Sequence, residues 1–148
     1  RKITSLAART IGVERAGVWI LGTSGTTLHC VVTYIASKAT FEGKDVVLSG
    51  FDYPSYFQAV RTEGVLDASN AHTDPRTSGF SASYLTPLGI QSMLDIPLWA
   101  NGTLRGVLCC EHVGPKPRDW SPSVQRFGLT LTQILSQHWT VVGSTRTR

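Results

Sequence analysis

The sequence has few charged residues and no long apolar run. Charged residues make up 16% of the 148 residues and hydrophobic residues 41%, which excludes an intrinsically disordered chain. The longest apolar stretches, such as residues 16–21 and 107–110, are far shorter than the roughly 20 residues of a membrane-spanning helix. No signal-peptide pattern opens the chain. We expect a cytoplasmic globular domain that does not insert into a membrane.

Cysteine is also scarce, because only Cys30, Cys109 and Cys110 are present. An odd number with two adjacent residues is a poor disulfide framework, and reduced, buried thiols fit better. Residues 109–112 (Cys-Cys-Glu-His) look like metal ligands, but neighbours on a strand point to opposite faces. A catalytic thiol needs an exposed, electropositive setting, which this segment lacks. We expect no metal site, no catalytic residue and no evident cofactor.

Positive charge gathers only at the chain ends. Lys and Arg number 14 against 10 Asp and Glu, and four of the basic residues lie at the tips. The remaining 10 basic residues balance the 10 acidic ones and are scattered singly. Nucleic-acid-binding domains concentrate Lys and Arg on one face, so we expect no nucleic-acid partner.

The length fits one domain, over residues 1–148. The sequence does not begin with Met, and helices are expected at both ends, over residues 1–12 and 121–142. We expect a domain excised from a longer multidomain protein. The terminal helices carry apolar residues outside their main apolar face, including Leu129 and Trp139. These helices pair in a parallel homodimer, or they pack on each other and on the sheet; both arrangements are compatible.

Two hairpins and a few shorter elements are expected between these helices. Residues 15–22 and 27–36 form the first hairpin, and the alternation of the second strand places Leu28, Cys30, Val32 and Tyr34 on one face. Residues 91–99 and 103–112 flank Asn101-Gly102, a strong hairpin signal. A helix capped by Asp52, short strands at 46–48 and 65–68 and a long irregular stretch at 69–83 lie between them. The order predicts an α+β fold: an antiparallel sheet of five to six strands with helices on both faces.

Several motifs of the C-terminal half resemble one family. They are residues 74–76 (Asp-Pro-Arg), 84–90, 92–98, 101–112 and 120–122 (Trp-Ser-Pro). On these residues the chain resembles GAF domains, the small-molecule-sensing modules of bacterial signalling proteins. The resemblance covers nearly the whole chain and is looser over the first 65 residues. It implies a PAS-related fold and a place upstream of an output domain such as a histidine kinase or a diguanylate cyclase.

Subfamily signatures of GAF domains are missing from this sequence. The Asn-Lys-x-x-Asp pattern of cyclic-nucleotide-binding members does not occur, and the expected pocket helices lack the cysteine to which phytochromes attach a bilin. The pocket loops also lack the cysteines of free methionine sulfoxide reductases, and His72 is the single haem-ligand candidate in its loop. The resemblance therefore implies a pocket but names no ligand.

The candidate pocket lies between the sheet and residues 37–57 and 69–88. Its aromatic candidates are Phe41, Phe51, Tyr53, Tyr56, Phe80 and Tyr84. Its other candidates are Asn70, His72, Asp74, Arg76, Ser92, Met93, Asp95 and Glu111. The aromatic residues line a ligand pocket or form an ordinary second core. Arg76 holds an anionic ligand group, or it pins its loop by pairing with Asp95 or Glu111.

Three functions remain open on the sequence. The first is a regulatory domain that binds a small molecule and passes the change through its terminal helices to an output domain. The second is a dimerisation module with a filled pocket. The third is a thiol enzyme that uses Cys109 or Cys110 on the same scaffold.

Overall fold

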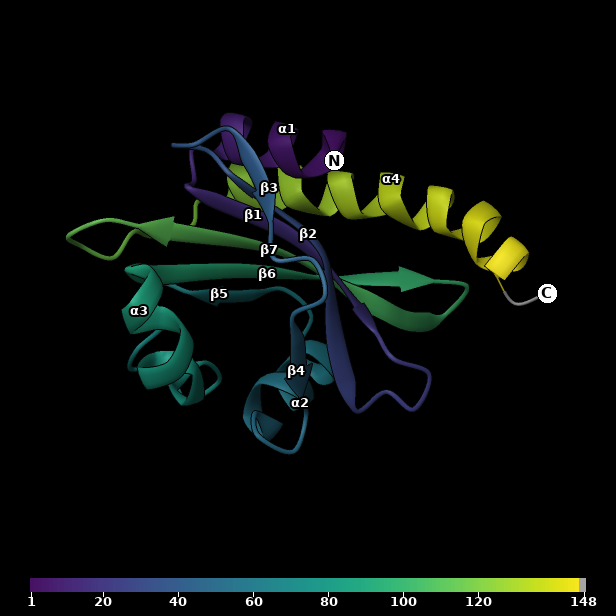
Figure 1. The fold of residues 1–148 in the computed structure, drawn as a ribbon, viewed down its shortest axis with the longest axis horizontal. Coiled ribbons are helices and arrows are strands. Elements are labelled where there is room, and N and C mark those ends of the chain that lie inside the picture. Colours follow the sequence, from purple (N-terminus) through teal and green to yellow (C-terminus); the bar gives the residue numbers. More distant parts are fainter. Residues whose placement is uncertain (147–148) are drawn as a thin grey trace.

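A single antiparallel sheet forms the centre of the protein. The computed structural model describes the backbone of residues 1–146 and the side chains of residues 1–138, so the expectation for Trp139 lies outside the described side chains. The described part contains seven strands: β1 (Arg15–Leu21), β2 (Thr27–Ile35), β3 (Thr40–Glu42), β4 (Val47–Ser49), β5 (Leu66–Ala68), β6 (Ile90–Ala100) and β7 (Thr103–Val113). Their order is β3-β2-β1-β7-β6-β5, with β4 on the other half of β2 (Figure 1). The α+β class and the antiparallel sheet are confirmed.

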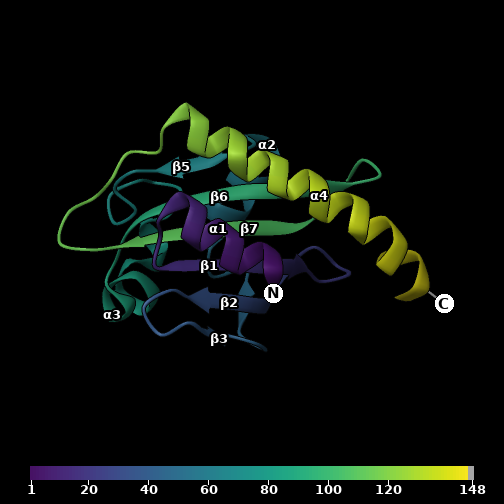
Figure 2. The ribbon, with the colours of Figure 1, turned by 90° about the horizontal axis from the view of Figure 1, so that it is seen from above.

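Helices cover both faces of this sheet, as expected. Helices α1 (Lys2–Ile11) and α4 (Pro122–Arg146) lie side by side on one face (Figures 1 and 2). The other face carries α2 (Pro54–Thr62) and a short helical segment made of η1 (Ser78–Phe80), η2 (Ser81–Leu85) and α3 (Thr86–Leu88). We call residues 78–88 the roof. Among the described residues, no helix is long and apolar enough to cross a membrane.

The helix ends follow local chemistry. Gly12 ends α1 in the left-handed conformation (φ 77°), where a side chain would be strained. The Ser121 hydroxyl accepts a hydrogen bond from the Val124 amide at 3.2 Å, and Pro122 occupies the first turn of α4. The expectation that Asp52 caps α2 is wrong. Tyr53 holds the cap position without a side-chain bond, and Pro54, whose φ is already helical, begins the helix.

Alternation along β6 and β7 divides the interior into two cores. Leu94 and Ile96 face α1 and α4, whereas Met93 packs in the core beneath α2 and the roof. The left-handed residues Asn101 (φ 53°) and Gly102 (φ 72°) form the tight turn between these strands and set their register. Asp95 therefore lies opposite Cys109, and Glu111 lies opposite Met93. These four residues share the face beneath the roof.

A bulge changes the expected alternation of β2. Val18 pairs with Val32 but Trp19 pairs with Cys30, so Val31 is the extra residue. Beyond Val31, each residue of β2 points to the face opposite to the one that strict alternation predicts. The Thr33 hydroxyl therefore lies within 3.5 Å of the Cys30 sulfur. The prediction that Cys30, Val32 and Tyr34 share one face is wrong for this reason. Leu28 and Cys30 remain on the face beneath α2.

Candidate functional site

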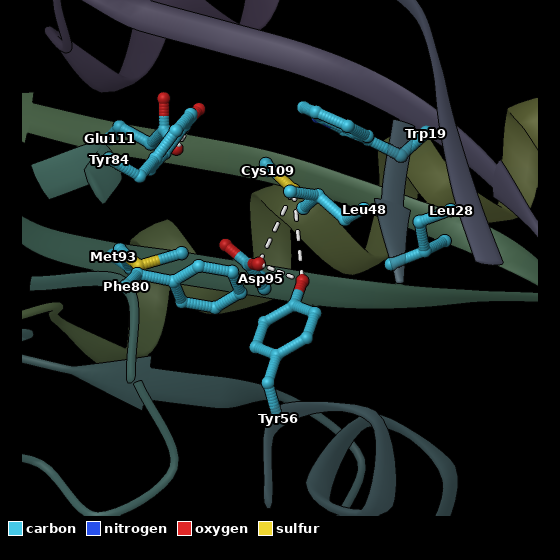
Figure 3. A pocket seen from close by; sticks show the side chains of 10 residues that line it. All are labelled: Trp19, Leu28, Leu48, Tyr56, Phe80, Tyr84, Met93, Asp95, Cys109 and Glu111. Atoms are coloured by element: carbon cyan, nitrogen blue, oxygen red, sulfur yellow. Dashed lines mark hydrogen bonds between the residues drawn. The ribbon is translucent and has the colours of Figure 1, made fainter. Parts of the chain in front are cut away.

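A small cavity lies between the sheet and the roof. It has a volume of about 10 Å³, which is room for about one water molecule. Strands β1, β2, β4, β6 and β7 line it from one side, and α2 and the roof from the other. The lining residues, drawn in Figure 3, are Trp19, Leu28, Leu48, Tyr56, Phe80, Tyr84, Met93, Asp95, Cys109 and Glu111.

Asp95 is the most deeply buried acid of this cavity, with a relative exposure of 0%. Its Oδ2 accepts a short hydrogen bond from the Tyr56 hydroxyl and a second from the Cys109 thiol at 3.3 Å (Figure 3). Within the described structure its Oδ1 has no hydrogen-bond partner. Burial raises the pKa of Asp95 to about 7; the bond from Tyr56 opposes the shift and the charge of Glu111 adds to it.

Glu111 is the second buried acid, and it joins the sheet to the roof. Its Oε1 accepts a hydrogen bond from Arg15 Nε at 2.8 Å, and its Oε2 accepts one from the Tyr84 hydroxyl at 2.8 Å. Arg15 begins β1 directly opposite Glu111, whereas Tyr84 comes from η2. Burial raises the pKa of the Tyr84 hydroxyl, and the charge of Glu111 raises it further. Tyr84 therefore remains a hydrogen-bond donor to Glu111 at neutral pH.

Polar and aromatic contacts hold the roof in place. His72 Nε2 donates to the carbonyl of Ile90 at 2.9 Å, so its Nδ1 accepts from the Ser81 hydroxyl at 2.7 Å in the neutral ring. The ring of Tyr53 stacks on Phe80 with centroids 4.2 Å apart, and its hydroxyl lies 3.2 Å from that of Ser83. Because both ring nitrogens of His72 are engaged, this histidine acts here as a roof support.

Arg76 lies outside the cavity and pairs with acids of its own surroundings. Its Nε and Nη2 bind the Asp74 carboxylate at 2.9 and 2.8 Å. Its Nη1 lies 3.8 Å from Glu63 Oε1, and the same Nη2 lies 3.7 Å from Asp67 Oδ1. The expected pairing of Arg76 with Asp95 or Glu111 is wrong, because Tyr56 and Arg15 already hold those two acids. The bond from Arg76 lowers the pKa of Asp74.

The other candidate residues divide between the cavity and its surroundings. The structure brings six of them to the cavity: Tyr56, Phe80, Tyr84, Met93, Asp95 and Glu111. Tyr53, His72, Asp74 and Arg76 lie in the layer around the roof. The cavity lining does not include Phe41, Phe51, Asn70 and Ser92.

Each of these last four residues has another setting. Phe41 packs on Tyr34 at the sheet edge, with ring centroids 5.1 Å apart. Phe51 is 84% exposed. Asn70 is exposed, and its carbonyl accepts a hydrogen bond from the Asp74 amide. The Ser92 hydroxyl accepts from the Arg118 amide and donates to the Ser69 carbonyl, so it anchors the segment that leads to α4.

Sequence reasoning did not place five residues of this site in the candidate pocket. Trp19, Leu28, Leu48 and Cys109 line the cavity, and Arg15 holds Glu111. A signal for Cys109 was present, because it shares a strand face with Glu111. For Arg15 the only signal was a charge at the start of an apolar strand, and its partner depends on the β1–β7 register.

The three thiols are poorly suited to chemistry. Burial raises the pKa of Cys30, Cys109 and Cys110, and the charge of Asp95 adds to the shift at both Cys109 and Cys110. A reactive cysteine needs the opposite setting, with a lowered pKa and an exposed sulfur. Among the side chains that the structure describes, no group of three His, Cys, Asp or Glu residues is placed to hold a metal ion.

Comparison with known proteins agrees with this geometry. The sequence matches the GAF domain family over residues 1–139. One similar structure is the GAF domain of an Acinetobacter phosphoenolpyruvate-protein phosphotransferase, with a TM-score of 0.70 and 19% identity over 96% of this chain and 82% of that one. No curated protein matches the sequence.

Two further structures are similar over most of their length. A domain of a putative two-component sensor histidine kinase protein from Sinorhizobium meliloti has a TM-score of 0.69 and 16% identity, over 99% of this chain and 92% of that one. The Thermosynechococcus elongatus PixJ GAF domain has a TM-score of 0.72 and 16% identity, over 99% and 88%. With the match over residues 1–139, they lead to one conclusion: the chain belongs to the GAF domain family.

Proposed function

We propose that this chain is a regulatory sensor domain that binds a small molecule between the sheet and the roof. Binding displaces or reorders residues 78–88, and helices α1 and α4 pass the change to an output domain of the parent protein. The domain itself is not catalytic. It acts in the cytoplasm as a homodimer.

The observation that carries this proposal is the unpartnered Oδ1 of Asp95 inside the cavity. A buried carboxylate oxygen without a hydrogen bond destabilises a fold. A core that serves only for packing gains nothing from such a group. A binding site does gain from it, because a ligand that supplies the missing bond is held by it.

The sheet provides a mechanical link between the cavity and the terminal helices. Strands β6 and β7 present Asp95 and Glu111 to the cavity and Leu94, Ile96 and Leu108 to the opposite core. The Arg15 partner of Glu111 lies four residues after the end of α1. A ligand can use this link only if it binds one arrangement of the domain more tightly than another.

The similar structures and the surface of α1 and α4 support the assignment to signalling. The neighbours include a domain of a putative two-component sensor histidine kinase protein and GAF domains of cyanobacteriochrome receptors. Leu6 on α1 and Leu129 and Ile134 on α4 are 41–46% exposed. Exposed apolar residues on two neighbouring helices fit a twofold dimer contact, the commonest arrangement of homo-oligomers.

A second candidate function is a dimerisation module with a filled pocket. The observation that favours it is the cavity volume of about 10 Å³, because aromatic side chains already occupy the space beneath the roof. The thiol enzyme has no such support, because Cys109 and Cys110 are buried and their thiols are held in the protonated form.

Native mass spectrometry of the gently purified chain, followed by a thermal-shift screen of small molecules, tests the two candidates. The sensor predicts a dimer with retained mass, or compounds that raise the melting temperature. Those compounds must raise the melting temperature of the Phe51→Ala variant equally, because the Phe51 side chain lies outside the cavity. They must not raise the melting temperature of the Asp95→Leu variant. A bare dimer that no compound stabilises would establish the structural module instead.

A further inference from the structure

We propose that the cavity recognises a flat aromatic ligand that carries an amidine, guanidine or amino group and no negative charge. This inference names a ligand class for the site, and it rests on the proposed function of that site. Its basis is the set of hydrogen-bonding groups, charges and ring faces that line the cavity.

The first argument is the hydrogen-bonding capacity of the lining. The buried Oδ1 of Asp95 has no partner among the described residues, and Figure 3 shows it turned from Tyr56 and Cys109 toward the region of Tyr84 and Glu111. Tyr56 and Cys109 already donate to Oδ2. An ionised carboxylate only accepts hydrogen bonds. The cavity therefore requires a ligand that donates.

The second argument is the charge of the lining. Asp95 lies opposite Cys109, and Glu111 follows two residues later on β7, so the two acids are diagonal neighbours on one face, with side-chain origins about 7–8 Å apart. No basic residue is among the described residues that line the cavity, and Arg15, which holds Glu111 from β1, lies outside the lining. Because Arg15 neutralises Glu111, the uncompensated charge of the lining is that of ionised Asp95. This charge repels carboxylates and phosphates and favours a cation.

The third argument is shape. Four of the ten lining residues are aromatic: Trp19, Tyr56, Phe80 and Tyr84. Phe80 meets Tyr56 edge-on at 5.0 Å and Tyr84 at 6.0 Å between ring centroids. These rings already contact one another, so once the roof moves, a flat ligand ring can pack against their exposed faces and edges, and a cation carried by that ring gains from the π-systems.

Entry of a ring requires the roof to move, because the cavity holds only about 10 Å³. The Tyr84 hydroxyl ties the roof to Glu111 Oε2. A second N–H of the ligand can replace that donor, so the same ligand satisfies Asp95 and releases Tyr84. Residues 81–85 form a π-helical turn. This geometry is rare in proteins, and where it occurs it often lies at a functional site.

Three probes of one shape test the inference: benzamidine, benzamide and benzoate, which are cationic, neutral and anionic. Isothermal titration calorimetry with the whole chain at pH 8 is expected to show benzamidine binding at least about tenfold more tightly than benzamide, and no binding of benzoate. Asp95→Asn should weaken benzamidine binding about tenfold or more. The matched control Asp45→Asn, which removes an exposed acid outside the cavity lining, should leave it unchanged.

A measurement on the unaltered chain covers the case in which Asp95→Asn does not fold. Benzamidine keeps its charge between pH 8 and pH 6, whereas Asp95, with a pKa of about 7, takes up a proton over that interval. Tyr56 and Cys109 face its Oδ2 as neutral donors, and Glu111, with its donor Tyr84, lies on the side toward which Oδ1 turns. Affinity for benzamidine should fall about tenfold on going to pH 6.

The outcomes separate the inference from the proposed function. Tighter binding of benzoate or benzamide than of benzamidine, lost in Asp95→Leu, would overturn the ligand class and leave the cavity as a ligand site. Benzamidine binding that is unchanged in Asp95→Asn would overturn it as well. Absence of binding by all three probes overturns the ligand class, and the wider thermal-shift screen then decides whether the cavity binds any small molecule.

Discussion

The Tyr56 hydroxyl donates its hydrogen bond to Asp95 Oδ2, and this bond connects helix α2 to strand β6 through the interior of the domain. Tyr56 is 3% exposed and Asp95 is 0% exposed. Burial raises the pKa of Tyr56, and the charge of Asp95 raises it further, so the hydroxyl keeps its proton. The position of α2 over the cavity therefore depends on a polar contact as well as on packing.

Replacement of Tyr56 by Phe should destabilise the domain, and more so at pH 8 than at pH 6. The change leaves the Cys109 thiol as the remaining donor to Asp95, and loss of one bond to a buried charged group costs about 1.5–3 kcal/mol. At pH 6 Asp95 is largely protonated and needs the bond less. Urea denaturation at both pH values measures the effect. Tyr53→Phe is the matched control, since its hydroxyl bond at 3.2 Å is exposed; an equal loss in both variants would contradict the role of Tyr56.

The stability of the domain should fall as pH rises toward 7. In the folded chain Asp95 has a pKa of about 7, whereas an unfolded Asp has a pKa of about 3.9. Between these values the folded state holds a proton that the unfolded state has lost, so the free energy of unfolding decreases as pH rises and levels off above 7. From pH 6 to pH 8 this one group accounts for about 1 kcal/mol.

Asp95→Asn is the variant that checks this pH dependence. It keeps an oxygen for Tyr56 but removes the titration, so the difference in unfolding free energy between pH 6 and pH 8 should shrink by about 1 kcal/mol. All other titrating groups are common to the two proteins and cancel from the comparison. A pH profile that is identical in the two proteins would show that Asp95 is not the group that takes up the proton.

Removal of Arg15 should be more harmful than removal of the whole Arg15–Glu111 pair. Arg15→Met leaves the carboxylate of Glu111, whose side chain is 4% exposed, without its cation, and such a change costs about 3–5 kcal/mol. The double variant Arg15→Met, Glu111→Gln keeps an acceptor for Tyr84 and leaves no unpaired charge at these two positions, so it should recover at least half of the loss. Urea denaturation of four proteins, the unaltered chain, Arg15→Met, Glu111→Gln and the double variant, gives the coupling energy. A double variant that is as unstable as the sum of both single changes would contradict the charge argument.

Local signals in the sequence were sufficient for most of the fold. Asn101-Gly102, Ser121-Pro122 and the alternation of β6 and β7 predicted a hairpin, a helix start and the face that carries Asp95 and Glu111. The bulge at Val31 was not predictable, because it depends on how β2 pairs with β1. Strand β3 was missed because its three residues are exposed and form a strand only by pairing with β2.

The site was harder to predict than the fold because its contacts join distant parts of the chain. The Arg15–Glu111 bond spans 96 residues, and the Tyr56–Asp95 bond spans 39. The long loop drew attention to Asp74 and Arg76, which bind each other two residues apart. Charge and loop position mark residues that need a partner, but the partner follows only from the strand register.

All three thiols should resist thiol–disulfide exchange in the folded chain. Cys110 is 0% exposed and Cys109 is 6% exposed, and burial keeps both protonated by raising the pKa of each. Ellman's reagent at pH 7.5 should therefore react only at the rate of unfolding and show all three thiols at once in urea. Rapid reaction of one thiol in the native chain, absent from Cys109→Ser or Cys110→Ser, would revive the thiol enzyme.

Arg76 should contribute to stability and not to ligand affinity. Its two bonds to Asp74 are charge-assisted, but its side chain is 24% exposed, so Arg76→Ala should lower the free energy of unfolding by about 1–2 kcal/mol. Arg76→Lys should recover little of this loss, because an ammonium group cannot make the paired contact. Thermal unfolding and benzamidine titration of the same proteins measure both properties. An Arg76→Ala protein with normal stability and no binding would place Arg76 in the ligand site.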